Sequence, residues 1–311
     1  MSHRRPLRTL LLFVTLSVAL GATACGGTSS GTAGGPGDRP QIVVTYPVLA
    51  AVVRQVAGDG AEVTTLMPNG ADPHEWSPSA KDVQKLLGAD LVVHNGLGLE
   101  NTLQKHLEKA RKDGVAVFAV ADHVTVRTVK AGEGAEADDP DQAPGAKDPH
   151  LWMDPLTMKQ WIGPLVPALR TAGVTSASAT ATEADLQALD RDITTIVQTV
   201  PPARRKLVTG HESLGYFAER YGFQLIGAVI PSITSQAEAS AGRLAELTKK
   251  IKEAGVPAVF TELGTPTATA ESIGRDSGAK VVELSTHVLP ADGTYRTFML
   301  DLTHAVAGAL T

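Results

Sequence analysis

The stretch TEADLQALDRDITTIVQTVPP (residues 182–202) separates two halves of the chain. Both halves have a hydrophobic pattern that differs from that of this stretch. Its apolar residues recur at helical spacing, which predicts one long amphipathic helix. They are Leu186, Leu189, Ile193, Ile196, Val197 and Val200. The Pro201-Pro202 pair ends this helix, because proline has no backbone N–H and clashes with the preceding turn. We therefore predict a stiff linking helix over residues 179–201.

On both sides of this helix, short β-branched runs alternate with helical patterns. The runs predict strands at 42–45, 62–66, 91–94, 115–120, 207–209, 225–230, 258–261 and 280–284. The intervening patterns predict helices from Val48, Ser79 and Leu99, near 238–254, and over 267–277 and 295–310. This alternation indicates an α/β fold with largely parallel sheets. We expect an N-terminal lobe over 41–178 and a C-terminal lobe over 202–311.

Size and composition support two lobes and exclude some classes of protein. The chain has 311 residues, of which 43% are apolar, which is enough for each lobe to bury its own core. A net charge of −5 argues against general nucleic-acid binding, because no basic excess neutralises phosphates. The single cysteine excludes an intramolecular disulfide framework and a cysteine-rich metal cluster.

The N-terminus has the order of segments that is typical of a secretory signal. Three arginines precede an apolar run over 10–20, which is too short to span a membrane, and small residues then lead to Cys25. These small residues resemble a bacterial lipobox, although Ala22 stands where leucine is commoner. We predict a signal peptide over 1–24, lipidation of Cys25 and a flexible tether over 25–40. The alternative is ordinary secretory cleavage, which would leave a free thiol.

Four of the nine histidines lie in loops beside predicted strand ends: His74, His150, His211 and His287. In an open α/β sheet the ligand site lies outside the carboxyl ends of the strands, where such loops emerge. Three neutral imidazoles converging there would suit a borderline metal, with a fourth position for oxygen or nitrogen. In the two Asp-Pro-His tripeptides, at 72–74 and 148–150, the aspartate can cap a turn or orient an imidazole.

The chain resembles the zinc/manganese substrate-binding lipoproteins of bacterial ABC transporters (cluster A, zinc type). The motifs that carry the resemblance are NGADPHE (69–75), ADLVVHNGLGLE (89–100), DPHLWMDP (148–155) and GHESLGYF (210–217) with YG (221–222). The resemblance covers roughly residues 40–310. It implies two similar lobes on a rigid linking helix, with one metal ion in the cleft between them.

The resemblance also implies a ligand set. The first three ligands of the family fall on His74, His150 and His211. Manganese-type members usually carry glutamate at the third place, so His211 favours zinc over manganese. The fourth ligand is usually an aspartate, but Ser285 aligns with it here; His287 then completes a four-histidine site, with Asp292 or a water as the alternative.

A segment in the N-terminal lobe departs from the family pattern. Zinc members often have a long histidine-rich loop, whereas Lys130–Lys147 is acidic and contains no histidine. We interpret this segment as an exposed acidic loop, because its acids stand among glycine, alanine and proline.

We therefore expect an extracytoplasmic, lipid-anchored zinc-binding protein at the cell surface or in the periplasm. It would act as a monomer and deliver its ion to a membrane permease driven by a separate ATPase. One alternative is a zinc hydrolase that uses Glu75 or Glu212 as general base and leaves the fourth site to water. A manganese-binding or adhesin-type member of the same family is the other.

Overall fold

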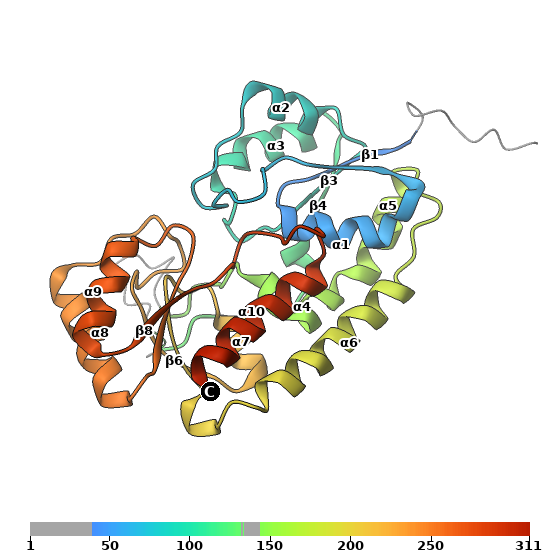
Figure 1. The fold of residues 1–311 in the computed structure, drawn as a ribbon. Helices are drawn as coiled ribbons and strands as arrows, with labels where there is room; N and C mark the ends of the chain where they lie inside the picture. The colour runs from blue at the N-terminus through green and yellow to red at the C-terminus, as the bar shows by residue number, and fades with distance from the viewer. Residues whose placement is uncertain (1–38, 132, 134–143) are drawn as a thin grey trace, which may run out of the picture. The chain divides into compact units, whose positions relative to one another are not determined.

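The first four strands form one parallel sheet, in the order β2-β1-β3-β4, in the computed structural model of residues 39–131, 133 and 144–311 (Figure 1). The strands are β1 (Gln41–Val44), β2 (Glu62–Thr65), β3 (Leu91–His94) and β4 (Ala116–Ala119). They alternate with α1 (Pro47–Ala57), α2 (Ala80–Leu87) and α3 (Gln104–Lys112). Parallel pairing places the carboxyl ends of all four strands at one edge of the sheet.

Local sequence signals explain where these helices begin. Pro47 opens α1, since its fixed φ suits the first helical position. Ser79 and Asp82 form the expected capping box at the start of α2. The helix predicted from Leu99 begins later, because the turn at Gly96–Gly98 has positive φ at three successive residues and a 3-10 turn (Asn101–Leu103) follows. Short 3-10 turns also occur at 58–60, 120–123, 151–153 and 202–204.

The middle of the chain contains the predicted linking helix, α6 (Thr180–Val197), which ends four residues before Pro201. Two helices that the sequence analysis did not predict precede it: α4 (Pro155–Gln160) and α5 (Ile162–Thr171). Asp154 caps α4, since its carboxylate accepts from the backbone N–H groups of Leu156 and Thr157. Helix α6 packs against α4 and α10, and is therefore embedded rather than a lone connection (Figure 1).

The second half repeats the strand–helix alternation with two parallel pairs. Strand β5 (Lys206–Thr209) pairs with β6 (Gln224–Ala228), and β7 (Ala258–Thr261) pairs with β8 (Lys280–Glu283). Strand β5 also lies next to β7. The helices are α7 (Gly215–Tyr221), not predicted, and the expected α8 (Ala241–Ala254), α9 (Thr267–Ser277) and α10 (Tyr295–Leu310). The predicted α/β class with parallel sheets is confirmed.

One hydrophobic core runs through both halves. It joins Val44 in β1, Leu189 in α6, Phe260 in β7 and Leu302 in α10. Smaller clusters lie elsewhere in the described part of the chain. One includes Leu86 and Leu107 of α2 and α3, and another includes Leu247 and Ile273 of α8 and α9. Because the largest core is shared, the two halves are packed against each other as well as linked by α6.

Some predictions of the sequence analysis lie outside the described residues. These are the signal peptide, Cys25, nearly all of the tether, and positions 132 and 134–143 of the acidic loop. The lobe boundaries at 178 and 202 remain predictions. Among the residues that the structure describes, no helix has both the length and the apolar character that crossing a membrane requires.

Candidate metal centre

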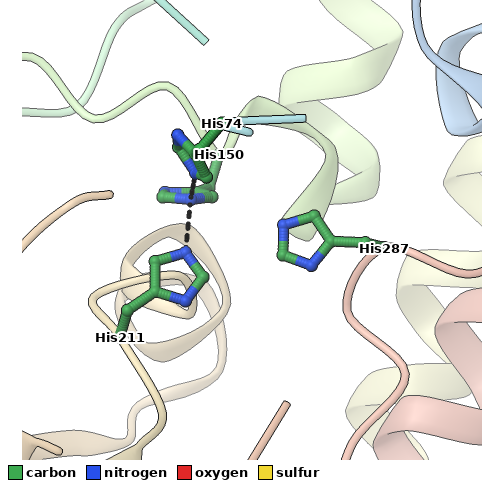
Figure 2. A group of neighbouring side chains, drawn as sticks. All are labelled: His74, His150, His211 and His287. Atoms are coloured by element: carbon green, nitrogen blue, oxygen red, sulfur yellow. Dashed lines mark hydrogen bonds between the residues drawn. The ribbon is translucent and has the colours of Figure 1, made fainter. Parts of the chain in front are cut away.

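Four histidine side chains from four loops point toward one another (Figure 2). His74 lies between β2 and α2, and His150 directly precedes the 3-10 turn at 151–153. His211 follows β5, and His287 follows β8. The four residues predicted from the sequence are thus brought together by both halves of the chain.

The spacing of the ring nitrogens suits one small metal ion. His150 Nε2 lies 3.4 Å from His74 Nε2 and 3.1 Å from His211 Nε2. One ligand atom from each of the four histidines lies within 4.8 Å of the other three. Nitrogens bound at about 2.0–2.1 Å in a tetrahedral shell would be about 3.3 Å apart. The His74–His150 and His150–His211 nitrogen pairs therefore have the spacing that one shared metal ion requires, and the other pairs lie within 4.8 Å.

The cluster is almost closed to solvent. His150, His211 and His287 have no exposed surface, whereas His74 is only half-buried. Within residues 39–131, 133 and 144–311, Nε2 of His287 is buried without a hydrogen-bond partner, although a buried ring nitrogen normally has one. Trp152 packs against His150 and His287 with ring centroids 5.3 and 5.7 Å away. An ion that accepts the lone pair of His287 Nε2 would satisfy this atom.

A carboxylate orients His150. Oδ1 of Asp148 lies 2.8 Å from His150 Nδ1 and also accepts the backbone N–H of His150 at 3.0 Å. The buried Arg127 guanidinium donates to Oδ2 of Asp148 at 3.1 Å and also pairs with Glu133. Because Nδ1 of His150 faces an acceptor, its proton resides there and Nε2 offers its lone pair to the centre.

Glu262 supports His211 through an ion-pair contact with the ring and a hydrogen bond to the backbone. Its Oε1 lies 2.9 Å from His211 Nδ1 and accepts the backbone N–H of His211 at 3.0 Å. Ser213 donates its hydroxyl to both carboxylate oxygens. The contact between Glu262 and His211 depends on the glycine at residue 210, because a Cβ there would lie 2.8 Å from Glu262 Cγ and 2.1 Å from Thr265 Oγ1. Any side chain at Gly210 would displace the carboxylate that orients His211.

His74 and His287 have partners of a different kind. The backbone N–H of His74 donates to Oδ1 of Asp72 at 2.9 Å, so Asp72 holds the loop rather than the ring. Nδ1 of His287 lies 2.8 Å from Oγ1 of Thr286. Three of the four rings thus have Nδ1 against an oxygen atom of the protein.

Burial and neighbouring charges shift the pKa values of the cluster in different directions. Burial lowers the pKa of His74 well below its usual value, and the other three imidazoles lower it further. Burial also lowers the pKa of His287 to about 3, against the opposing effect of Glu262. Burial alone would lower the pKa of His211, but the adjacent Glu262 carboxylate raises it above its usual value. His74 and His287 are therefore neutral, and ready to bind a cation, at neutral pH.

Ser285, which aligns with the family's fourth ligand, and Asp292, the alternative to His287, both lie outside the cluster. Ser285 is exposed and donates its hydroxyl to the carbonyl of Val288. The exposed Asp292 accepts hydrogen bonds from Thr294 and Thr297 at the start of α10. Both side chains are thus engaged in local turns.

Glu75 and Glu212, the candidate general bases of the alternative zinc-hydrolase hypothesis, have different surroundings. Glu75 is exposed, and Glu212 is buried. Burial, with the nearby Asp148 carboxylate, raises the pKa of Glu212 well above its usual value. Burial disfavours ionisation of Glu212, whereas the carboxylate of Glu75 faces solvent.

Two residues that support the site, Glu262 and Arg127, were not predicted from the sequence. Glu262 directly follows the buried strand β7, at the edge where ligands bind, so its position carried a usable signal. Arg127 lies in a segment without regular structure, and only the fold brings it to Asp148. The aspartates of the two Asp-Pro-His tripeptides were identified as possible supports, and both contact their histidines.

The chain is similar to known metal-binding proteins along most of its length. The family model described as "Zinc-uptake complex component A periplasmic" matches residues 42–309. The zinc-binding protein TroA of Treponema pallidum is 30% identical over 290 residues, which cover 90% of this chain and 86% of that protein. The manganese-binding lipoprotein MntA of Halalkalibacterium halodurans is 29% identical over 296 residues, 93% of each chain.

A solved structure supports the same relationship. The periplasmic zinc-binding protein TroA from Treponema pallidum superposes with a TM-score of 0.72 at 26% identity, over 88% of this chain and 99% of that one. The family consists of transport proteins and not of enzymes. With a matching family model over most of its length and a matching fold, the chain belongs to the ZnuA family of extracytoplasmic metal-binding components of ABC transporters.

Proposed function

We propose that this protein captures zinc and delivers it to the permease of an ABC importer, with His74, His150, His211 and His287 as the ligands. The observation that carries this proposal is the set of donor atoms: four imidazole nitrogens within 4.8 Å of one another. As a substrate-binding component, the protein serves a membrane permease and, through it, an ATPase.

The choice of zinc rests on the ligands, because the relatives differ in their metals. Proteins named for zinc, manganese and iron are 30%, 29% and 27% identical to this chain, respectively. Imidazoles suit zinc, whereas manganese prefers oxygen ligands and ranks below zinc for a given nitrogen site. In the described part of the chain, the carboxylates nearest to the rings contact Nδ1 atoms or backbone N–H groups. They therefore support the imidazoles instead of adding oxygen ligands.

Buried carboxylates favour retention of a divalent cation. Asp72, Asp148 and Glu262 are all buried within contact of a loop or ring of the cluster. The pKa of Glu262 is lowered, because the imidazoles of His211 and His287 outweigh the effect of burial, so this group is ionised. Negative charge behind neutral imidazoles stabilises the bound cation and strengthens the imidazoles as donors.

The membrane attachment is part of the same proposal. The small residues before Cys25 support lipidation of that residue, and several relatives are named lipoproteins. We propose a monomer that is held at the outer surface of the cell membrane by this lipid. Replacing Cys25 with alanine should release the exported protein from membranes, as fractionation and immunoblotting would show. Membrane attachment that persists in Cys25→Ala would contradict the lipid anchor.

The zinc assignment is tested by measuring stoichiometry and selectivity. Native mass spectrometry of the purified protein should show one zinc ion per chain, and chelator-competition titrations should give far tighter binding for zinc than for manganese. His211→Glu should narrow this difference by adding an oxygen ligand. His304→Ala is the matched control, since His304 lies exposed on α10. Equal affinity of the parent protein for both metals would contradict zinc selectivity.

A further inference from the structure

The loop that carries His74 is bonded to the second half of the chain at two places. Nδ2 of Asn69 donates to the carbonyl of Leu289 at 2.9 Å, and Oδ1 of Asn69 accepts the N–H of Leu289 at 2.8 Å. Both backbone groups of Leu289 are therefore used by one side chain, 220 positions away in sequence. Since Leu289 is two residues from His287, this pair ties the loop of one histidine to the loop of another.

The second connection is closer to His74. The Ser235 hydroxyl donates to Oδ2 of Asp72 at 2.6 Å, in a buried position. The other oxygen of Asp72 accepts the backbone N–H of His74. The carboxylate of Asp72 thus links Ser235 in the second half directly to the backbone of His74.

The turn that supports His211 also packs against this carboxylate. Gly264 has a φ of +86°, and a Cβ there would lie 2.6 Å from Oδ2 of Asp72 and 2.8 Å from Cβ of Ser235. Glu262, two residues earlier, contacts His211. One short turn therefore contains Glu262, which contacts His211, and packs against Asp72, which holds the backbone of His74. This close packing and the positive φ explain why the turn contains a glycine at residue 264, since residues with a side chain rarely adopt this backbone conformation.

The partial exposure of His74 connects the hydrogen bonds of Asn69 and Asp72 to metal binding. His74 is the half-buried member of the cluster, and the other three rings have no exposed surface. An ion that enters or leaves must therefore pass the side on which His74 lies, or the fold must open further. The bonds of Asn69 and Asp72 hold the segment over 68–75 in place on that side.

On the basis of the proposed function, we infer that Asn69, Asp72 and Ser235 are positioning residues that hold His74 over the ion and slow its release. They touch neither the ion nor its ligand atoms. Their effect reaches the site through the position of His74 relative to His211 and His287. Loss of the bonds should weaken binding mainly by speeding dissociation, because the other three ligands remain in place.

The test compares Asn69→Ala and Ser235→Ala with the parent protein by stopped-flow transfer of zinc to a chelator. We expect each alanine variant to release zinc about tenfold faster, as is typical when a support of a ligand is lost. Ser235→Thr, which keeps the hydroxyl, should restore slow release. Asn101→Ala removes an exposed amide on a 3-10 turn and is the control.

A double-mutant cycle separates positioning from general destabilisation. In a His74→Ala background, adding Asn69→Ala should change the zinc release rate less than twofold, since the ring that the bond positions is gone. Zinc release at the parent rate in both Asn69→Ala and Ser235→Ala would overturn the inference. So would a result in which Asn69→Ala speeds zinc release by the same factor in the His74→Ala background as in the parent protein. Neither result would affect the zinc proposal, which fails if the parent protein does not bind one zinc ion or binds manganese as tightly as zinc.

Discussion

Removing His287 is the most informative single change, because the sequence left the fourth ligand open. In the structure His287 is fully buried, and its ring is stacked against that of His211 with centroids 5.8 Å apart. Its Nε2 has no hydrogen-bond partner among the residues that the structure describes. His287→Ala therefore removes one nitrogen donor from the proposed shell and leaves the other three in position.

The expected loss follows from the strength of zinc binding. A four-ligand zinc site contributes about 10–16 kcal/mol, or about 2.5–4 kcal/mol per ligand. A water molecule can enter the space left by the ring and occupy the fourth place, which returns part of this energy. We expect a net loss of about 2 kcal/mol, which corresponds to roughly thirtyfold weaker binding.

The measurement is a zinc titration against a chelator of known affinity, at pH 7.5 and constant ionic strength. The stoichiometry should remain one, and the affinity should fall by the stated factor. His304→Ala serves as the control for loss of an exposed imidazole. If His287→Ala titrates like the parent protein, the four-histidine site is wrong and the fourth place belongs to Asp292, another carboxylate or solvent.

Three further changes test the site and the core. Zinc affinity should fall as the pH falls, because protons compete with the ion for imidazole. Glu262 raises the pKa of His211, so this ligand is protonated at higher pH than His74 and His287, whose pKa values are lowered. Glu262→Gln should bind zinc about 10–100-fold more weakly at neutral pH. The pH at which half of the zinc affinity is lost should also move to a lower value, because His211 no longer faces a carboxylate. Zinc titrations at several pH values would measure both effects, and an unmoved midpoint would contradict the role of the carboxylate. Leu189→Ala in α6 should lower the free energy of unfolding by about 2–5 kcal/mol, since Leu189 is fully buried in the shared core. Denaturant unfolding measures this free energy, and a change below about 0.5 kcal/mol would argue against a shared core.

Much of the fold could be predicted because it depends on local patterns. The strands are short runs with β-branched residues, of which β2 and β8 are only partly buried. The predicted helices at 267–277 and 295–310 agree with α9 and α10 in both bounds. The helices that were missed, α4, α5 and α7, are short or contain proline and glycine, so their periodicity is weak. The role of α6 in a shared core also escaped prediction, because its packing against α4 and α10 depends on residues far away in sequence.

For the site, the sequence by itself determined the kind of residues and the loops that carry them. Asp-Pro-His occurs twice, Gly-His-Glu once, and each motif follows or precedes a recognisable element. These motifs indicated a metal and made three histidines the leading ligands. They did not decide between His287 and Asp292, since both lie in the same segment after β8.

Only the tertiary structure brought His287 to the other three rings and left Asp292 at the start of α10. It also placed Glu262 beside His211 and Asn69 against Leu289, contacts between loops from distant parts of the chain. The physical reason is that a metal shell is a set of distances in space, and these are set by how strands and helices pack, not by the order of residues along the chain.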